Sequence, residues 1–175
     1  GHLDLYVAND LLENFLWRGK GDGSFVEDGL FAGCALNGQG QPEGSMGVDA
    51  TDFEGDGDED LFMTHAASQT NTLFENDGSG VFRDRSLDMG ISSPSYKTTA
   101  FGTAFFDLDQ DGTLEILAVN GAVRALDALV RDRDAFPYHE RNHLYRLQPE
   151  GHYREVGAEA GPALAHSAVS RSAAF

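Results

Sequence analysis

Short apolar runs separated by glycine and aspartate turns dominate the chain. Around residues 15–17, 73–74 and 144–145 these runs are four to six residues long, and Gly-Asp or Asp-Gly steps bound many of them, which is typical of β-hairpins. Residues 61–63 and 116–119 are almost continuously apolar, as expected of strands that are buried on both faces. The pattern therefore predicts an all-β fold.

The same pattern recurs along the chain. GVDATDFEGDGDEDLFMT (47–64) superposes on GTAFFDLDQDGTLEILAV (102–119) at an offset of 55 residues, and GHLDLYVAN (1–9) fits the same frame at an offset of 56. A second block of the form Asn-x-Leu-aromatic begins at Asn14, Asn71 and Asn142, and each time a turn containing glycine and then an aromatic residue follow. Four strands per repeat describe the blade of a β-propeller, so we expect a partial propeller of four-stranded antiparallel blades.

This frame divides the 175 residues into pieces of one propeller. Residues 1–45 would end one blade, residues 46–100 and 101–165 would each form a full blade, and residues 166–175 would supply the first strand of the next. The remaining blades of the same propeller are then expected as partners of this segment.

The third repeat is longer than the second. Asn71 and Asn142 are 71 residues apart, against 57 for Asn14 and Asn71. The additional residues fall at 122–136, where a helical face would be shared by Val123, Leu126, Leu129 and Val130. We expect one short helical insert that packs over the blade connections.

Two acidic segments carry the candidate chemistry. In residues 52–60 and 107–115, carboxylates stand at loop positions 1, 3, 5 and 9, and a glycine stands at position 6. The carboxylates are those of Asp52, Glu54, Asp56 and Asp60 in the first loop and of Asp107, Asp109, Asp111 and Glu115 in the second. The residues at position 7, Asp58 and Thr113, would offer backbone carbonyl oxygens.

Calcium is the expected ligand of these loops. Carboxylates crowded into nine residues repel one another, and a hard set of oxygen donors suits Ca²⁺ better than Mg²⁺. A solvated acidic turn without an ion is the alternative. An EF-hand is excluded because position 12 holds Met63 or Ala118 instead of glutamate, and because the flanking segments are predicted strands.

The loops resemble the calcium loop of the FG-GAP (VCBS) repeat, Asp-x-Asp/Asn-x-Asp-Gly-x-x-Asp, which occurs in integrin α-chain propellers and exported bacterial proteins. The asparagine blocks and the ending VSRSAAF (169–175) resemble more narrowly the cartilage acidic protein and ASPIC/UnbV group. The resemblance implies an extracellular or periplasmic protein with calcium ligands in both loops, and makes Asp4 the remnant of another site. Glu54 and Glu115 depart from the pattern, since they are longer than the usual Asp or Asn.

The charge of the chain excludes some partners. With 29 acidic and 12 basic residues the net charge is −17, so the chain would repel nucleic-acid phosphates. No apolar stretch is long enough to predict a membrane span. We expect a non-catalytic module for interaction and adhesion, with a protein or glycan as its ligand.

One further motif favours an enzyme. Residues 139–143 spell His-Glu-x-x-His, whose histidines bind zinc when they share one face of a helix. Here the segment is predicted to be extended, which would separate His139 and His143 by about 13 Å. The alternatives to the interaction module are therefore a zinc metallohydrolase, which this geometry disfavours, and the propeller part of a secreted hydrolase.

Overall fold

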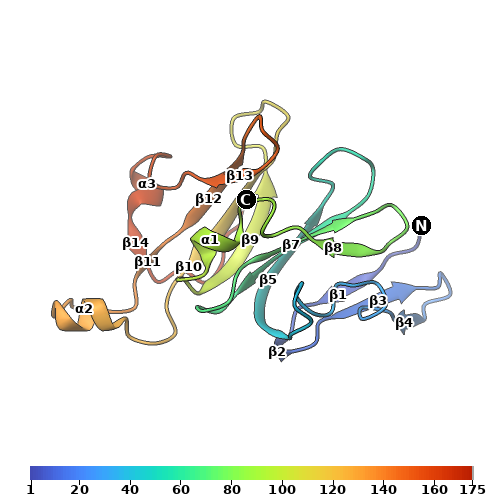
Figure 1. The fold of residues 1–175 in the computed structure, drawn as a ribbon, viewed down its shortest axis with the longest axis horizontal. Helices are drawn as coiled ribbons and strands as arrows, with labels where there is room; N and C mark the ends of the chain where they lie inside the picture. Colours follow the sequence, from blue (N-terminus) through green and yellow to red (C-terminus); the bar gives the residue numbers. More distant parts are fainter. Residues whose placement is uncertain (175) are drawn as a thin grey trace.

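The computed structural model describes residues 1–174, which form three larger antiparallel sheets and one two-stranded sheet (Figure 1). The first sheet has the order β1-β3-β4 and consists of β1 (Leu5–Val7), β3 (Phe15–Gly19) and β4 (Phe25–Glu27). The second contains β5 (Glu43–Thr51), β6 (Asp60–His65), β7 (Thr72–Asn76) and β8 (Phe82–Asp84). The third consists of β9 (Ala100–Phe106), β10 (Glu115–Asn120), β12 (His143–Leu147) and β13 (Tyr153–Glu155).

The second and third sheets have the same internal pairing. Leu61 of β6 pairs with Phe74 of β7, and Ile116 of β10 pairs with Tyr145 of β12. The apolar strands β6 and β10 lie inside their sheets, and every residue of β6 is buried, as the continuous apolar runs predict. The prediction of an all-β, partial β-propeller with four-stranded antiparallel blades is confirmed.

Additional strand pairs connect one repeat to the next. β2 (Asp10–Leu12) adds to the start of β5, and β11 (Glu140–Arg141) pairs in the same way with β14 (Ser167–Ala168). The turns that follow β4 and β8 reach the outer strand of the following sheet. There the carbonyl of Ala32 accepts the N–H of Phe82 at 2.7 Å, and that of Met89 accepts the N–H of Tyr153 at 2.8 Å.

The first strands of the second and third sheets, β5 and β9, lie side by side (Figure 1). The N–H of Phe105 donates to Asp49 Oδ2 at 2.8 Å. At Gly47 the backbones come so close that a Cβ would lie 2.0 Å from the carbonyl oxygen of Phe101. Glycine at this position therefore permits the two blades to pack.

Two hydrophobic clusters fill the spaces between the sheets. The cluster between the second and third sheets is built around Phe62, whose ring lies edge-on to Phe105 at 6.0 Å and tilted against Tyr145 at 6.4 Å. A smaller cluster joins the first sheet to the second and contains Leu16, Leu61 and Cys34. The blades are thus joined by shared apolar cores.

The insert differs from the expectation. Besides the short helices α1 (Ser92–Ser95) and α3 (Pro162–Ala165), the described residues contain α2 (Asp127–Arg131), which projects away from the sheets and has no buried residue (Figure 1). Val123 lies outside this helix, so the apolar face is interrupted, and its side chain is exposed, as is that of Val130. The prediction that the helix packs over the blade connections is wrong. None of the helices described is long and apolar enough to cross a membrane.

Candidate metal centre

The acidic loop 107–115 connects β9 to β10 and is wound around one carboxylate. Asp107 accepts the backbone N–H of Asp111 at 3.0 Å and that of Gly112 at 2.9 Å. Asp111 in turn accepts the N–H of Thr113 at 2.7 Å. Gly112 has a φ of 87°, a value that glycine adopts without strain. The carboxylate at position 1 therefore fixes the turn, as the glycine at position 6 predicts.

Three of the predicted ligands come together in this loop. Asp107, Asp109 and Glu115 each offer one carboxylate oxygen, and these oxygens lie within 4.8 Å of one another. It is the one such group of three or more acidic, histidine or cysteine ligands in residues 1–174, and Asp111 is not part of it. The loop thus gathers oxygen donors at positions 1, 3 and 9.

A basic side chain lies against this group. Arg146 of β12 donates from Nε to Glu115 Oε1 at 3.0 Å, and one of its terminal nitrogens lies 3.3 Å from Asp109 Oδ2. The second oxygen of Glu115 accepts the N–H of Leu108 at 2.9 Å, and the Glu115 side chain is buried. A cation therefore already compensates part of the charge of the three carboxylates.

The loop 52–60 connects β5 to β6 and repeats the turn. Asp52 accepts N–H groups from Gly55 at 2.7 Å, Asp56 at 3.0 Å and Gly57 at 2.8 Å, and these bonds, that of Gly57 most, lower the pKa of Asp52. Asp56 accepts the N–H of Asp58 at 3.1 Å. In the described chain the carboxylates of this loop do not form a group as close as that of the second loop.

Position 9 of the loop 52–60 carries an unusual carboxylate. Asp60 is buried and accepts the N–H of Asn76 at 2.8 Å and that of Phe53 at 3.2 Å. Burial raises its pKa from 3.8 to about 6 in spite of these bonds. Partial burial, with the nearby charges of Glu75 and Asp60, raises the pKa of Glu54 to about 7. The surroundings of these two carboxyl groups therefore disfavour their charged forms.

Asp4 occupies the equivalent place in the first sheet. Its Oδ1 accepts the N–H of Gly19 at 2.8 Å, as Asp60 accepts that of Asn76 in the second sheet. Arg18 lies 3.9 Å from its second oxygen. The contact agrees with the repeat frame, and within residues 1–174 Asp4 belongs to no group of three or more possible metal ligands.

The donors of both loops fit a calcium ion. The side chains at positions 1, 3, 5 and 9 all offer carboxylate oxygens, without sulfur or nitrogen ligands, and this is the donor set of a hard cation that accepts many oxygens. In the loop 107–115 three of these groups are already gathered around one point. The chemistry of the donor set therefore agrees with the expected metal.

Comparison with known families agrees with the repeat frame. A family model described as FG-GAP-like repeat matches residues 1–63 and again residues 52–118. The chain belongs to the FG-GAP-like repeat family. The two matches to this family overlap at the acidic loop 52–60, and the second also contains the loop 107–115. No curated protein matches the chain at a significant level.

The repeated asparagines of this FG-GAP-like chain share a polar contact. The sequence alone did not indicate what these residues do. The side-chain oxygens of Asn14, Asn71 and Asn142 accept backbone N–H groups at the end of the preceding segment, from Asn9 at 2.8 Å, His65 at 3.1 Å and Asn120 at 2.8 Å. The recurrence of asparagine was the signal for these residues. They close the connection between consecutive strands and do not belong to the acidic loops.

The His-Glu-x-x-His segment of this FG-GAP-like chain is not helical. Glu140 lies in β11 and His143 in β12, and the three side chains of the motif have separate partners. Glu140 accepts the N–H of Thr99 at 3.0 Å, whereas His143 Nδ1 lies 3.2 Å from the hydroxyl of Tyr145. His139 lies 3.5 Å from Asp134. The two histidines therefore do not share the helical face that a zinc motif of this type needs.

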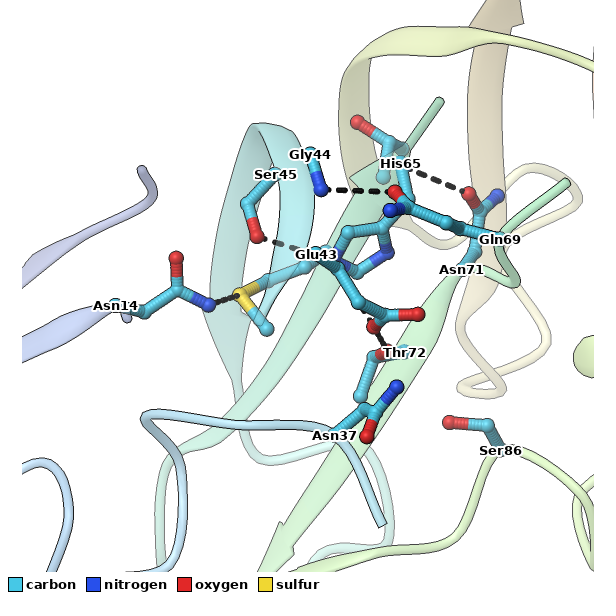
Figure 2. Close-up of polar contacts among 12 residues, drawn as sticks. Asn14, Asn37, Glu43, Gly44, Ser45, His65, Gln69, Asn71, Thr72 and Ser86 are labelled. Carbon is cyan, nitrogen blue, oxygen red and sulfur yellow. Dashed lines mark hydrogen bonds and ion pairs between the residues drawn. The ribbon is translucent and has the colours of Figure 1, made fainter. Parts of the chain in front are cut away.

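A buried polar cluster at the start of β5 also contains serine, histidine and glutamate (Figure 2). Ser45 Oγ lies 3.1 Å from His65 Nε2, and Glu43 Oε2 lies 3.5 Å from the same nitrogen. Thr72 donates to Glu43 Oε2 at 3.2 Å. In a hydrolase triad the carboxylate instead contacts the ring nitrogen opposite the one that faces the serine, whereas here Ser45 and Glu43 both lie against Nε2. Burial lowers the pKa of His65 to about 4, so a neutral histidine links β5 to β6.

The raised pKa of Asp60 predicts a pH dependence in the metal-free chain. The folded chain holds this proton more tightly than the unfolded chain, so the contribution is fully present below pH 4 and is lost as the pH rises through about 6. We expect the melting temperature of the wild type, relative to that of Asp60→Asn, to fall over this interval in chelator, because the wild type alone loses this contribution, whereas the opposite contribution of His65 is present in both. Asp132→Asn, at the exposed end of the insert, should keep the wild-type slope. Equal slopes in all three proteins would contradict the assignment.

Proposed function

We propose that this chain is part of a calcium-binding β-propeller that acts outside the cytoplasm, in an extracellular or periplasmic space, as a non-catalytic module for interaction with a protein or glycan and for adhesion. The observation that supports this most is the group formed by Asp107, Asp109 and Glu115 in a loop whose turn is fixed by Asp107. The narrower similarity to the ASPIC/UnbV group belongs to the same proposal.

The role of the ion would be to stabilise the connection between the first two strands of a blade. Asp107, Asp109 and Glu115 would hold it in the loop 107–115, joined by Asp111 and the carbonyl of Thr113. In the loop 52–60 the corresponding ligands would be Asp52, Glu54, Asp56, Asp60 and the carbonyl of Asp58. Calcium supplies charge compensation there, and because it binds the folded loop better than the unfolded chain, it stabilises the fold.

An extracellular or periplasmic location is consistent with weak calcium sites. Extracellular calcium modules have dissociation constants of about 10⁻⁴ to 10⁻³ M, so they are filled where calcium is abundant. The net charge of −17 is compatible with such surroundings, because divalent cations screen acidic surfaces.

A surface suited to ligand contact lies at the other end of β6 from the acidic loop. A cavity of about 650 Å³ is lined there by residues 66–68 and 122–127, together with Thr99 and Glu140. Phe136, at the end of the insert, and Tyr138, whose carbonyl accepts the N–H of the lining residue Ala122, both expose large side chains. Exposed aromatic residues beside a cavity favour interaction with a ligand, and the ligand would be a protein or glycan.

The proposal predicts that calcium raises the melting temperature of the chain. At 100 times the dissociation constant, one site adds about 2.7 kcal/mol, which corresponds to about 5–10 °C for a protein of this size. Differential scanning calorimetry with calcium and with chelator measures the shift. Asp109→Asn, which removes one charge from the gathered group, should reduce the shift.

The matched control is Asp132→Asn, which removes the same charge from the exposed insert and should keep the full shift. The proposal is wrong if the wild-type chain shows no calcium-dependent shift. It is also wrong if Asp132→Asn reduces the shift as much as Asp109→Asn, because the effect would then reflect net charge and not a site.

A further inference from the structure

The residue four positions after the repeated asparagine differs in charge between the second and third sheets. Because Leu61 pairs with Phe74 and Ile116 with Tyr145, the next residues, Glu75 and Arg146, occupy equivalent positions in β7 and β12. Both face the acidic loop of their own sheet: Arg146 contacts the loop 107–115, and the charge of Glu75 acts on Glu54. One loop therefore has a cation at this position and the other an additional anion.

Arg146 holds two of the three gathered carboxylates. Its Nε lies 3.0 Å from Glu115 Oε1 and its terminal nitrogen 3.3 Å from Asp109 Oδ2. The Glu115 side chain is only 2% exposed, so water screens the charge of Glu115 poorly in this ion pair. The oxygens at positions 3 and 9 are thus already bound to a positive charge.

The loop 52–60 has no equivalent cation. It contains six acidic residues, against four in the loop 107–115. Within residues 1–174 none of these six forms an ion pair with an arginine, lysine or histidine. Arg85, which directly follows β8, pairs with Glu75 and Asp88. The positive charge of Arg85 is therefore largely compensated by these two carboxylates, and it compensates the charge of the loop 52–60 only weakly.

We propose that Arg146 is an internal counter-ion that sets the calcium affinity of the loop 107–115 below that of the loop 52–60, so that the two loops fill at different calcium concentrations. This inference rests on the proposed calcium function. A divalent ion that enters the loop 107–115 must either displace the guanidinium from Asp109 and Glu115 or bind next to a like charge, and both lower the affinity. An ion that enters the loop 52–60 meets no cation paired with its carboxylates, since Arg85 acts on Glu54 from outside the loop and more weakly than Glu75, Asp60 and Asp56 do.

The test is a calorimetric titration of the metal-free chain with calcium chloride. Asp56→Ala serves as the background in all proteins, because it removes a ligand from the loop 52–60 and leaves the loop 107–115 to report. In this background Arg146→Gln should bind calcium about tenfold more tightly, the change that corresponds to 1.4 kcal/mol. Arg146→Lys, which keeps the charge, should bind close to the parent.

Two controls remove the same charge elsewhere. Arg154 pairs across the sheet with Arg146 but forms its ion pair with Glu159, and Arg131 ends the exposed helix α2. Arg154→Gln and Arg131→Gln should therefore each stay within about twofold of the parent, since the charge of Arg154 is compensated by Glu159 and that of Arg131, on the exposed insert, is screened by solvent. Circular dichroism in chelator verifies that each variant is folded before titration.

The outcomes separate the two proposals. Tighter binding in Arg146→Gln alone supports the counter-ion. Unchanged or weaker binding in Arg146→Gln, or an equal increase in Arg146→Lys or Arg154→Gln, overturns it while calcium binding itself stands. If Arg146→Gln does not fold, Arg146→Met, which also removes the charge, takes its place with the same expected tenfold increase, and unchanged or weaker binding in that variant overturns the inference. Absence of binding in every protein, including the chain without Asp56→Ala, overturns the proposed function and this inference together.

Discussion

Gly47→Ala is expected to destabilise the chain by about 3 kcal/mol, at the upper end of the usual cost of overpacking. A Cβ at this position would lie 2.0 Å from the carbonyl oxygen of Phe101, and a backbone oxygen in a paired strand cannot move away as a side-chain end can. The two strands would have to separate, and the hydrogen bond from the N–H of Phe105 to Asp49 would be lost. Equilibrium unfolding in denaturant measures the difference.

A matched control lies on the same strand. A Cβ at Gly44 would have as its nearest atoms the side-chain ends of Asp10 and Gln69, at 3.1 and 3.3 Å, which can turn aside. Gly44→Ala should therefore change the free energy of unfolding by less than about 1 kcal/mol. If Gly44→Ala and Gly47→Ala were equally stable, the close approach of β5 and β9 would be incorrect.

Phe62→Ala is expected to cost about 3–5 kcal/mol, as is usual when a buried phenylalanine is truncated. Phe62 has no exposed surface and lies between two sheets, in contact with Phe105 of β9 and Tyr145 of β12. Its loss would leave a cavity that neither sheet can close alone. The unfolding transition should remain cooperative and shift to lower denaturant, because the apolar cluster is shared by both blades.

Phe31→Ala removes the same atoms from an exposed position. Phe31 is 87% exposed, so its truncation should change the free energy of unfolding by less than about 0.5 kcal/mol. Urea or guanidinium unfolding of the two variants side by side provides the comparison. A small effect of Phe62→Ala, similar to that of Phe31→Ala, would mean that the second and third sheets do not share this core.

The sequence predicted the parts of the fold that depend on period and polarity. The offset of 55 residues placed Leu61 and Ile116 at the same point of two sheets, and their pairing with Phe74 and Tyr145 agrees with it. The turns of both acidic loops followed from glycine at position 6, which allows the chain to wind around the first carboxylate. Local chemistry was sufficient in these cases.

Features that depend on contacts between segments far apart in the sequence could not be predicted in this way. Nothing in the repeat frame indicated that Arg146 would lie against Asp109 and Glu115, because β12 is separated from the loop by the insert. The helical period of residues 122–136 led to the wrong expectation that the insert packs on the body, since amphipathic spacing does not reveal whether a surface is available to cover it. Calcium binding, location and ligand stay predictions, as does the absence of catalysis.

The carbonyls of Ala32 and Met89, which each accept an N–H from the outer strand of the following sheet, imply a rule for how such chains can change their length. Tandem duplication or deletion of one whole unit recreates the same donor and acceptor at the new junction, whereas a change by part of a unit would leave one of them without its counterpart. Residues 122–136 lie in the connection from β10 to β11, away from these junctions. Extra residues can accumulate there during evolution without disturbing the succession of blades.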